Sequence, residues 1–193
     1  WPAHLVMLAA FAVVIALAVA LGAPPAHPDQ YQWSDLPSQA LLIHAWGLHT
    51  GSGWNLPTWS LSALVICYAA FPTLWRKLNR VGASLLLFIG GLAAVWAADL
   101  VSRTLYHHAL FDLPFNLGVL RALPLFVFGA CIARAGELDW PPSRWAVWLA
   151  VASGLLVTVL QGFGRFDLMS VALLGLLVGA GGAVRTSRGQ QVA

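Results

Sequence analysis

The chain has 193 residues, of which 60% are apolar, 9% are charged and ten are tryptophans. A soluble domain carries about 25% charged residues, so this composition excludes a soluble globular protein and predicts several membrane-spanning helices. The formal net charge of +3 does not indicate a nucleic-acid partner, because the basic residues are scattered at the ends of apolar stretches.

The apolar stretches predict an all-α, polytopic membrane bundle with about six transmembrane helices, organised as a single membrane domain over residues 1–193. Crossing the hydrocarbon core takes about 20 residues of helix. Residues 38–49, SQALLIHAWGLH, are too few to span and predict a short interfacial or re-entrant helix. The predicted spans cover residues 2–21, 56–75, 81–98, 116–133, 145–160 and 167–184.

The basic residues predict the orientation of the bundle, because cytoplasmic loops carry an excess of Lys and Arg. Loops of one parity hold seven basic residues, and loops of the other parity hold two. We therefore expect residues 76–80, residues 134–144 and the C-terminal tail in the cytoplasm. The loops at 22–55 and 99–115 are expected on the outer side, and His4 near the inner end of the first span.

Arg121 lies inside the fourth predicted span, near its outer third. An arginine there costs about 3 kcal/mol unless it is paired or snorkels to the headgroups, so a buried functional role is one hypothesis and a snorkelling side chain is the other. Asp99 ends the third predicted span on the same side and is an expected partner for Arg121. Arg103 and Asp112 are expected in the loop between these two spans.

Most histidines fall on the predicted outer side and are expected to be interfacial. His44 differs, because the residues LLIHAW place it in an otherwise apolar helix, where it is a candidate general base. His44 and His49 are five residues apart and would not share one helix face. We expect no metal site, and Cys67 and Cys131, both inside apolar spans, are expected to be small core residues.

The second predicted span opens with a polar, aromatic group of residues, and residues 55–75 contain no Asp, Glu, Lys, Arg or His. A membrane anchor needs only apolar residues, so hydroxyl and indole groups at one end indicate chemistry or packing at one membrane face. Ser60 and Ser62 lack the Gly-x-Ser-x-Gly turn of a serine nucleophile. Serines in a span more often bond backbone carbonyls or neighbouring helices.

Residues 55–62, NLPTWSLS, followed by 68–72, YAAFP, resemble the signature of the acyltransferase-3 family of integral membrane O-acyltransferases. In that family an Asn-x-Pro-x-Trp-Ser-Leu-Ser stretch leads into a span that ends Tyr-x-x-x-Phe-Pro. Two weaker pieces are also similar to the family: residues 1–5, WPAHL, and Arg121 with the following Phe126 and Gly129. The resemblance covers most of residues 1–135.

This chain departs from the family's pattern at two places. Many members carry a Glu two residues after the second Ser, where this chain has Leu64. The first spans of the family, which hold a His general base and an accompanying Arg, have no counterpart here. We expect them ahead of Trp1 in a longer protein.

The resemblance implies transfer of an acyl group from a cytoplasmic acyl-CoA donor to a hydroxyl of a cell-surface carbohydrate or lipid. That reaction needs a base for the hydroxyl and hydrogen-bond donors for the tetrahedral oxyanion. The candidate catalytic residues are Arg121, Ser60 and His44, and the candidate substrate-binding residues are Asn55, Trp59, Ser62 and Asp99. Acyl-CoA is the expected co-substrate, with no bound cofactor. The expected partners are the acyl donor, the acceptor and the lipids of a bacterial inner or plasma membrane.

Two other interpretations stay open at this point. In a transporter or channel, Arg121 and Asp99 would line a path for an ion or a substrate, although the spans show no inverted repeat. The chain could also be a non-catalytic membrane scaffold of acyltransferase ancestry. The presence of Leu64 where many members carry Glu favours this interpretation, because a scaffold does not need the Glu.

Overall fold

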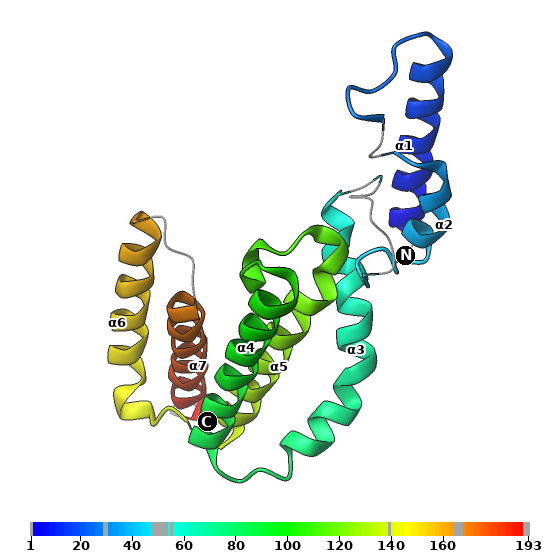
Figure 1. Ribbon diagram of the computed structural model, residues 1–193. Helices are drawn as coiled ribbons and strands as arrows, with labels where there is room; N and C mark the ends of the chain where they lie inside the picture. The colour runs from blue at the N-terminus through cyan, green and yellow to red at the C-terminus, as the bar shows by residue number, and fades with distance from the viewer. Residues whose placement is uncertain are drawn as a thin grey trace. The chain divides into compact units, whose positions relative to one another are not determined.

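The computed structural model describes residues 2–28, 31–47, 54, 56–138, 140–163 and 168–190. Every regular element in these ranges is helical, which confirms the all-α prediction (Figure 1). The chain divides into two compact units: residues 1–69 with 112–123 form the first, and residues 70–111 with 124–193 form the second. Helices α3 and α5 each begin in the first unit and end in the second.

The first unit holds the N-terminal helices and the beginnings of α3 and α5. Pro2 opens α1, at a position where its missing N–H has no intrahelical partner to lose. Both α3 and α5 are preceded by one turn of 3-10 helix. The elements are α1 (Pro2–Ala20), η2 (Trp33–Asp35), α2 (Leu36–Ala40), η3 (Leu56–Thr58), α3 (Trp59–Leu78), η5 (Phe115–Leu117) and α5 (Gly118–Glu137).

Helix α2 lies beside the N-terminal half of α1 (Figure 1). The Nε2–H of His4 donates a hydrogen bond of 2.8 Å to the carbonyl oxygen of Gln39, and both residues are buried. The charge pattern of the sequence placed His4 near the inner end of its span and residues 38–49 on the outer side. Because His4 and Gln39 are in contact, these two placements cannot both hold. After α1 the chain returns to the N-terminal half of that helix, where α2 packs (Figure 1).

The prediction of a helix over residues 38–49 is wrong beyond Ala40, where α2 ends. Residues 41–47 form turns, and Leu42 and Gly47 have positive φ angles of 56° and 81°. The backbone groups of Ala45 and Gly47 bond to distant parts of the first unit, as described below, and such bonds compete with helix formation. Residues 48 and 49 lie outside the described residues.

Trp54 is buried inside the first unit, with 2% of its surface exposed. Its Nε1–H donates to the carbonyl oxygen of Gln32 at 2.8 Å, and its ring packs edge-on against Tyr31 and Trp33. Trp54 therefore belongs to a packed aromatic cluster, in which the indole finds both an apolar wall and a hydrogen-bond acceptor.

The second unit contains α4 (Ser84–Tyr106), α6 (Ser143–Gly162) and α7 (Leu168–Gln190), with the short η4 (Leu110–Asp112) beginning inside it. Helix α4 ends eight residues beyond the span predicted for residues 81–98. Arg103 therefore lies in a helix, and the prediction that it lies in a loop is wrong. The helix ends at His107, whose φ of 59° is the left-handed geometry that commonly terminates helices.

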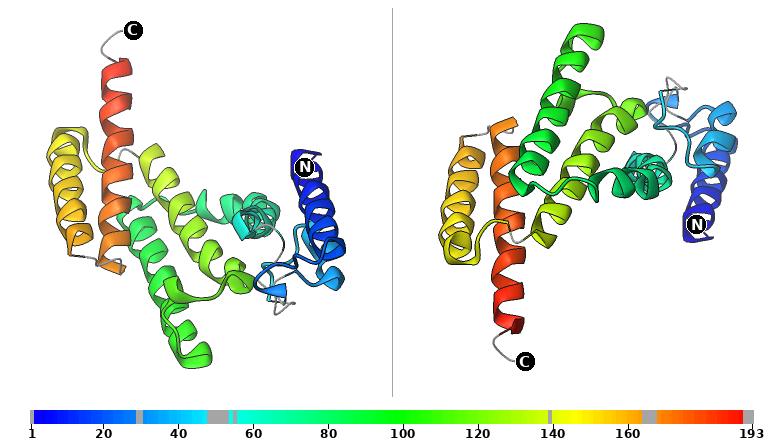
Figure 2. Two further views of the ribbon diagram at one scale, coloured as in Figure 1. Left: turned by 90° about the horizontal axis from the view of Figure 1, so that it is seen from above. Right: turned by 90° about the horizontal axis from the view of Figure 1, so that it is seen from below.

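Phe128 of α5 is the centre of packing in the second unit. It makes an edge-on contact with Phe88 of α4, at 5.3 Å between ring centres. A Cβ added at Gly91 would lie 2.8 Å from the Phe128 ring, and one added at Gly175 would lie 2.5 Å from it. These two glycines therefore let α4 and α7 approach the same aromatic ring. Helices α6 and α7 lie side by side in both views of Figure 2.

Four helices of the described chain are long and apolar enough to cross a membrane. Cys131 is buried beside Leu87 and Ala135, and Cys67 is also buried, as small core residues would be. Helix α3, which was also predicted to span, has 20 residues with hydroxyls near its start and two basic residues in its last turn. The four helices are Pro2–Ala20, Ser84–Tyr106, Phe115–Glu137 and Arg144–Gly162, and Leu168–Ala183 is a shorter apolar helix.

Candidate functional site

Three segments that are distant in the sequence meet in the first unit: the turns at 41–47, the start of α3 at 58–62, and residues 113–121 at the start of α5. We call this meeting point the three-segment cluster. Two backbone hydrogen bonds join the first segment to the third. Gly47 N–H donates to the carbonyl of Asn116 at 2.8 Å, and Val119 N–H donates to the carbonyl of Ala45 at 3.1 Å.

Ser62 joins the turns to α3. Its side-chain oxygen accepts a hydrogen bond of 3.1 Å from the backbone N–H of Ala45, and its carbonyl accepts one of 3.1 Å from Trp46 Nε1–H. Ser62 and Ala45 are both completely buried. The Ser62 side chain thus satisfies a backbone donor that water does not reach.

Replacing Ser62 with alanine is expected to lower the free energy of unfolding by about 1–3 kcal/mol, because the buried Ala45 N–H loses its acceptor. Ser60→Ala is the matched comparison two residues earlier on α3. The Ser60 hydroxyl donates to the carbonyl of Pro57 at an exposed position, where water replaces it, so little change is expected. Thermal unfolding in detergent measures the stability of both variants. Equal stability of the two variants would contradict the role given to Ser62.

Arg121 lies against two aromatic rings. Its guanidinium carbon is 4.2 Å from the centre of the Trp59 ring and 5.7 Å from that of Phe115. One guanidinium nitrogen also makes a long hydrogen bond of 3.5 Å to the carbonyl of Leu113. A guanidinium over aromatic faces is stabilised by the negative charge of those faces. The two rings therefore fix the place of a positive charge while leaving it partly exposed.

Gly118 makes the approach of α5 to Trp59 possible. A Cβ built on Gly118 would lie 2.7 Å from the Trp59 ring and 3.1 Å from the Cβ of Ala45. Side chains do not pack at 2.7 Å without displacement, so only glycine fits here with the ring in its present place. Gly118 therefore contributes to the position of Trp59, and through Trp59 to that of Arg121.

His44 lies in the turns of the cluster and is buried. Its Nε2 atom is 3.4 Å from the side-chain oxygen of Thr58, which is buried at the start of α3. The imidazole is thus held between the first two segments. A neutral imidazole carries one donor and one acceptor nitrogen, so a ring in this place can accept a proton.

The structure brings together four of the residues singled out from the sequence: Trp59, Ser62, His44 and Arg121. Ser60 lies beside them on α3, but its hydroxyl hydrogen is directed to the carbonyl of Pro57 within the same turn. Asn55 lies outside the described residues. The catalytic and substrate-binding roles of all these residues stay predictions.

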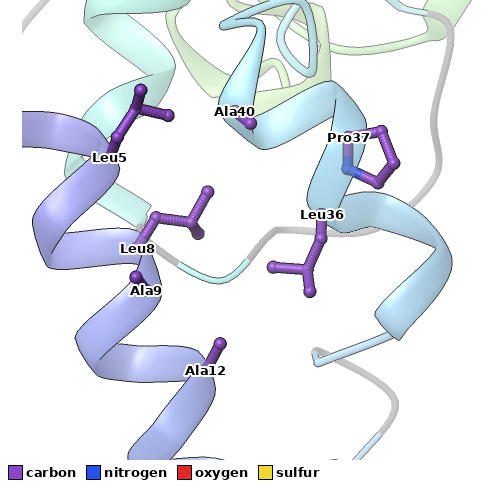
Figure 3. Close-up of a pocket in the computed structure, with 7 residues that line it drawn as sticks. All are labelled: Leu5, Leu8, Ala9, Ala12, Leu36, Pro37 and Ala40. Atoms are coloured by element: carbon purple, nitrogen blue, oxygen red, sulfur yellow. The ribbon is translucent and has the colours of Figure 1, made fainter. Parts of the chain in front are cut away.

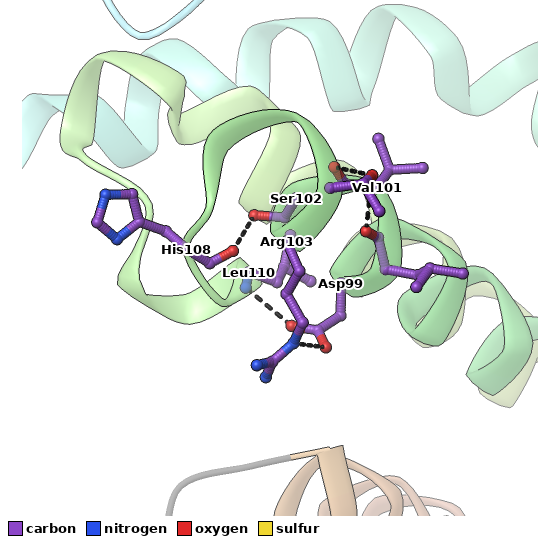
Figure 4. Close-up of polar contacts among 8 residues, drawn as sticks. Asp99, Val101, Ser102, Arg103, His108 and Leu110 are labelled. Carbon is purple, nitrogen blue, oxygen red and sulfur yellow. Dashed lines mark hydrogen bonds and ion pairs between the residues drawn. The ribbon is translucent and has the colours of Figure 1, made fainter.

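Asp99 belongs to the second unit, at the C-terminal part of α4 (Figure 4). One carboxylate oxygen accepts from Arg103 Nε–H at 2.7 Å, and the other accepts from the backbone N–H of Leu110 at 2.9 Å. Nearby, the hydroxyl of Ser102 donates to the carbonyl of His108 at 2.8 Å. These bonds attach the end of α4 to the loop that follows it. An ion pair between Asp99 and Arg121 stays a prediction.

Asp99→Ala is expected to lower the free energy of unfolding by about 1–3 kcal/mol, because the buried Leu110 N–H loses its acceptor. Asp99→Asn keeps a side-chain oxygen for that bond and loses only the charge opposite Arg103, whose side chain is 60% exposed. An ion pair so exposed contributes little, so the asparagine variant should stay near the wild type. Denaturant unfolding in detergent compares them. A loss as large for asparagine as for alanine would show that the charge, not the bond to Leu110, matters.

Sequence reasoning missed Gly118 and Phe115, and it did not connect Thr58 with His44. The sequence could have pointed to Gly118, because it precedes Arg121 by three residues and therefore lies on the same helix face. Nothing in the sequence pointed to Phe115 or Thr58, since each contacts residues that are far away in the chain.

Within the described ranges, no group of three or more His, Cys, Asp or Glu side chains is placed to hold a metal ion. A protein-family model described as "Acyltransferase domain" matches residues 3–190, nearly the whole chain. No curated protein and no solved structure matches the chain.

Proposed function

This chain belongs to the acyltransferase family whose domain spans residues 3–190, and from that premise we propose that the three-segment cluster is its acyl-transfer site. The proposed reaction moves an acyl group from a cytoplasmic acyl-CoA donor to a hydroxyl of a cell-surface carbohydrate or lipid. The group transferred is not an aminoacyl group. The observation that carries the proposal is the fixed guanidinium of Arg121 over Trp59, in the same unit as His44.

In the proposed mechanism, the hydroxyl oxygen of the acceptor attacks the thioester carbonyl, and the carbonyl oxygen becomes an oxyanion. Arg121 holds this negative charge, or a phosphate of the donor, with guanidinium N–H groups whose direction is fixed by the two rings. When the tetrahedral intermediate collapses, the carbon–sulfur bond breaks and the CoA thiolate leaves.

His44 takes the proton of the attacking hydroxyl in this proposal and returns it to the departing thiolate. Thr58 orients the imidazole, and Ser62 holds the turn that carries it by accepting from the neighbouring residue Ala45. Trp59 forms one wall of the acceptor site, and Asn55 and Ser60 are proposed to complete its mouth.

The protein is a membrane protein, and we propose that it lies in a bacterial inner membrane. The charge distribution supports placing residues 76–80 and 134–144 in the cytoplasm, where acyl-CoA is made available. The same charge distribution places the loops at 22–55 and 99–115, and with them the three-segment cluster, toward the outer side. The proposal therefore requires that the protein carries the acyl group from the cytoplasmic donor to the cluster, where the acceptor is bound.

The experiment uses sealed membrane vesicles from cells that produce the full-length protein. Inside-out vesicles expose the cytoplasmic face, and they are given radiolabelled acetyl-CoA or octanoyl-CoA. Label is expected in the lipid or the polysaccharide fraction, in excess of vesicles without the protein. Right-side-out vesicles should incorporate much less, because the donor does not cross the membrane. Absence of excess label in both kinds of vesicle would contradict the proposal.

One observation favours a non-catalytic scaffold instead. Leu64, two residues after Ser62 in α3, is apolar where many family members have Glu. The same vesicle experiment decides between the two functions, since a scaffold transfers no label from either donor.

A further inference from the structure

Basic side chains gather in the second unit where α3 ends and the chain turns toward α4. Arg76 and Lys77 lie in the last turn of α3, and Arg80 lies in the turn that follows. All three residues are exposed, and none of them forms an ion pair within the residues that the structure describes. We call Arg76, Lys77 and Arg80 the basic turn.

The basic turn is fixed to the rest of the second unit. The carbonyl of Asn79 accepts a long hydrogen bond of 3.5 Å from Arg134 at the end of α5. Leu78 and Val81 pack against the buried residues between α4 and α5. The carboxylate of Glu137 is already paired with Arg134 at 2.7 Å, so it does not neutralise the basic turn. The charges of the turn are therefore held in one place on the surface.

Arg76 and Arg80 are one helical turn apart. The backbone N–H of Arg80 donates to the carbonyl of Lys77 at 3.1 Å, so the chain continues to turn beyond the end of α3. Like charges at this spacing repel each other. The Nε–H of Arg76 donates to the carbonyl of Pro72 at 3.3 Å, which leaves the two terminal nitrogens for another acceptor. A phosphate that accepts hydrogen bonds from both guanidinium groups would remove the repulsion.

The start of α4 adds to the positive potential of the basic turn. Helix α4 begins at Ser84, and its N-cap residue Ala83 makes no side-chain hydrogen bond to the first turn. Gly82 is exposed, and a Cβ added there would meet no atom within 4 Å, so the start of the helix is open to approach. The first N–H groups of a helix attract negative charge. They strengthen the attraction that the arginines exert on an anion.

Membrane orientation alone does not require this arrangement. A cytoplasmic loop needs only an excess of positive charge, and Arg144 meets that need equally well. Arg144 is exposed near the start of α6, which Figure 1 shows on the far side of α5 and α7 from the end of α3. The first two turns of α6 hold no other Lys or Arg, whereas the basic turn has three cations within five residues. The basic turn is thus a concentrated positive surface.

We propose that the basic turn binds the 3′-phosphate of the CoA donor. This inference rests on the proposed function. A phosphate monoester carries about −1.5 to −2 charges and three acceptor oxygens, so it pairs with Arg76 and Arg80 together. The hollow between α1 and α2 is no alternative, because only Leu, Ala and Pro side chains line it (Figure 3). Of the two roles proposed for Arg121, holding the oxyanion then remains.

Arg80→Gln tests the proposal in the full-length protein, held in phosphatidylcholine nanodiscs with radiolabelled CoA and dephospho-CoA as probes. Dephospho-CoA lacks the 3′-phosphate, and the wild type should bind it about tenfold or more weakly than CoA. Arg80→Gln should bind CoA about tenfold more weakly than the wild type does, but dephospho-CoA to within about twofold. Because Arg80 is exposed and makes no ion pair in the described chain, the unfolding temperature should not change.

Arg144→Gln is the matched control, since it removes one exposed positive charge from the second unit outside the basic turn. It should bind both probes as the wild type does. Equal losses of CoA binding in Arg80→Gln and Arg144→Gln would show attraction by net charge alone and would overturn the proposal. Equal binding of CoA and dephospho-CoA to the wild type would overturn it as well.

Nanodiscs that contain phosphatidylglycerol separate the donor's phosphate from a lipid headgroup. Repulsion of CoA by this anionic lipid should lower the affinity of the wild type and of Arg80→Gln alike. A loss confined to the wild type would assign the basic turn to lipid headgroups and overturn the proposal. If CoA binds as expected while vesicles transfer no acyl group, the proposed function fails and the phosphate site stands. Transfer by a wild type that binds dephospho-CoA as tightly as CoA would leave the function standing and remove the site.

Discussion

Arg121→Ala is expected to lower kcat/KM for acyl transfer about 100-fold or more, the size of effect seen when a donor to an oxyanion is removed. Arg121→Lys should recover only part of the activity, because an ammonium keeps the charge but loses the planar fork of N–H groups. Stability should change little, since one cation–aromatic contact contributes about 0.5–2 kcal/mol. Label transfer in vesicles gives the activity, and thermal unfolding in detergent gives the stability.

Arg144→Ala is the control for this prediction. Arg144 is exposed near the start of α6, in the second unit, so its removal takes away a positive charge without touching the cluster. Wild-type activity is expected. If Arg121→Ala retains activity within threefold of the wild type, Arg121 has no part in the reaction and the proposed mechanism is wrong.

Gly118→Ala is expected to lower kcat/KM about tenfold or more without replacing any group that reacts. The added Cβ would lie 2.7 Å from the Trp59 ring and 3.1 Å from the Cβ of the completely buried Ala45. Trp59 must move, and Arg121 loses the ring that fixes it. Extra atoms in a packed region typically cost about 1–3 kcal/mol, so the unfolding temperature should also fall.

Gly136→Ala is the matched substitution on the same helix, α5. A Cβ at Gly136 meets no atom within 4 Å, so no displacement is expected. Because alanine favours a helix over glycine by about 1 kcal/mol, this variant should be as stable as the wild type or more so, with unchanged activity. Equal behaviour of the two variants would show that Gly118 is not held tightly against Trp59.

The sequence predicted the features that depend on local composition. The apolar stretches identified a helical membrane protein, and the NLPTWSLS signature identified its family, which the match over residues 3–190 confirms. Helix α3 begins at Trp59, inside that signature and directly after the turn that contains Pro57. These predictions succeeded because hydropathy and proline geometry act over a few neighbouring residues.

The errors arose where polar atoms find partners that the pattern of apolar stretches does not show. Helix α4 continues past Asp99, because the carboxylate pairs with Arg103 one turn later and the two charges do not require a loop. The helix predicted over 38–49 ends early, because the N–H of Ala45 bonds to Ser62 instead of to its own turn. The cluster itself was not predictable, since Gly118 and Phe115 act only through contacts with Trp59 and Arg121.

A double-mutant cycle in acyl transfer, with Trp59→Leu, Arg121→Ala and the combination, tests the three-segment cluster as the reacting site most directly. Contacting residues show coupling of about 0.5–3 kcal/mol, so Arg121→Ala should cost about tenfold less activity in the Trp59→Leu protein than in the wild type. If the two losses simply multiply, to within about twofold, Trp59 does not position Arg121 for catalysis and the account of the site is contradicted.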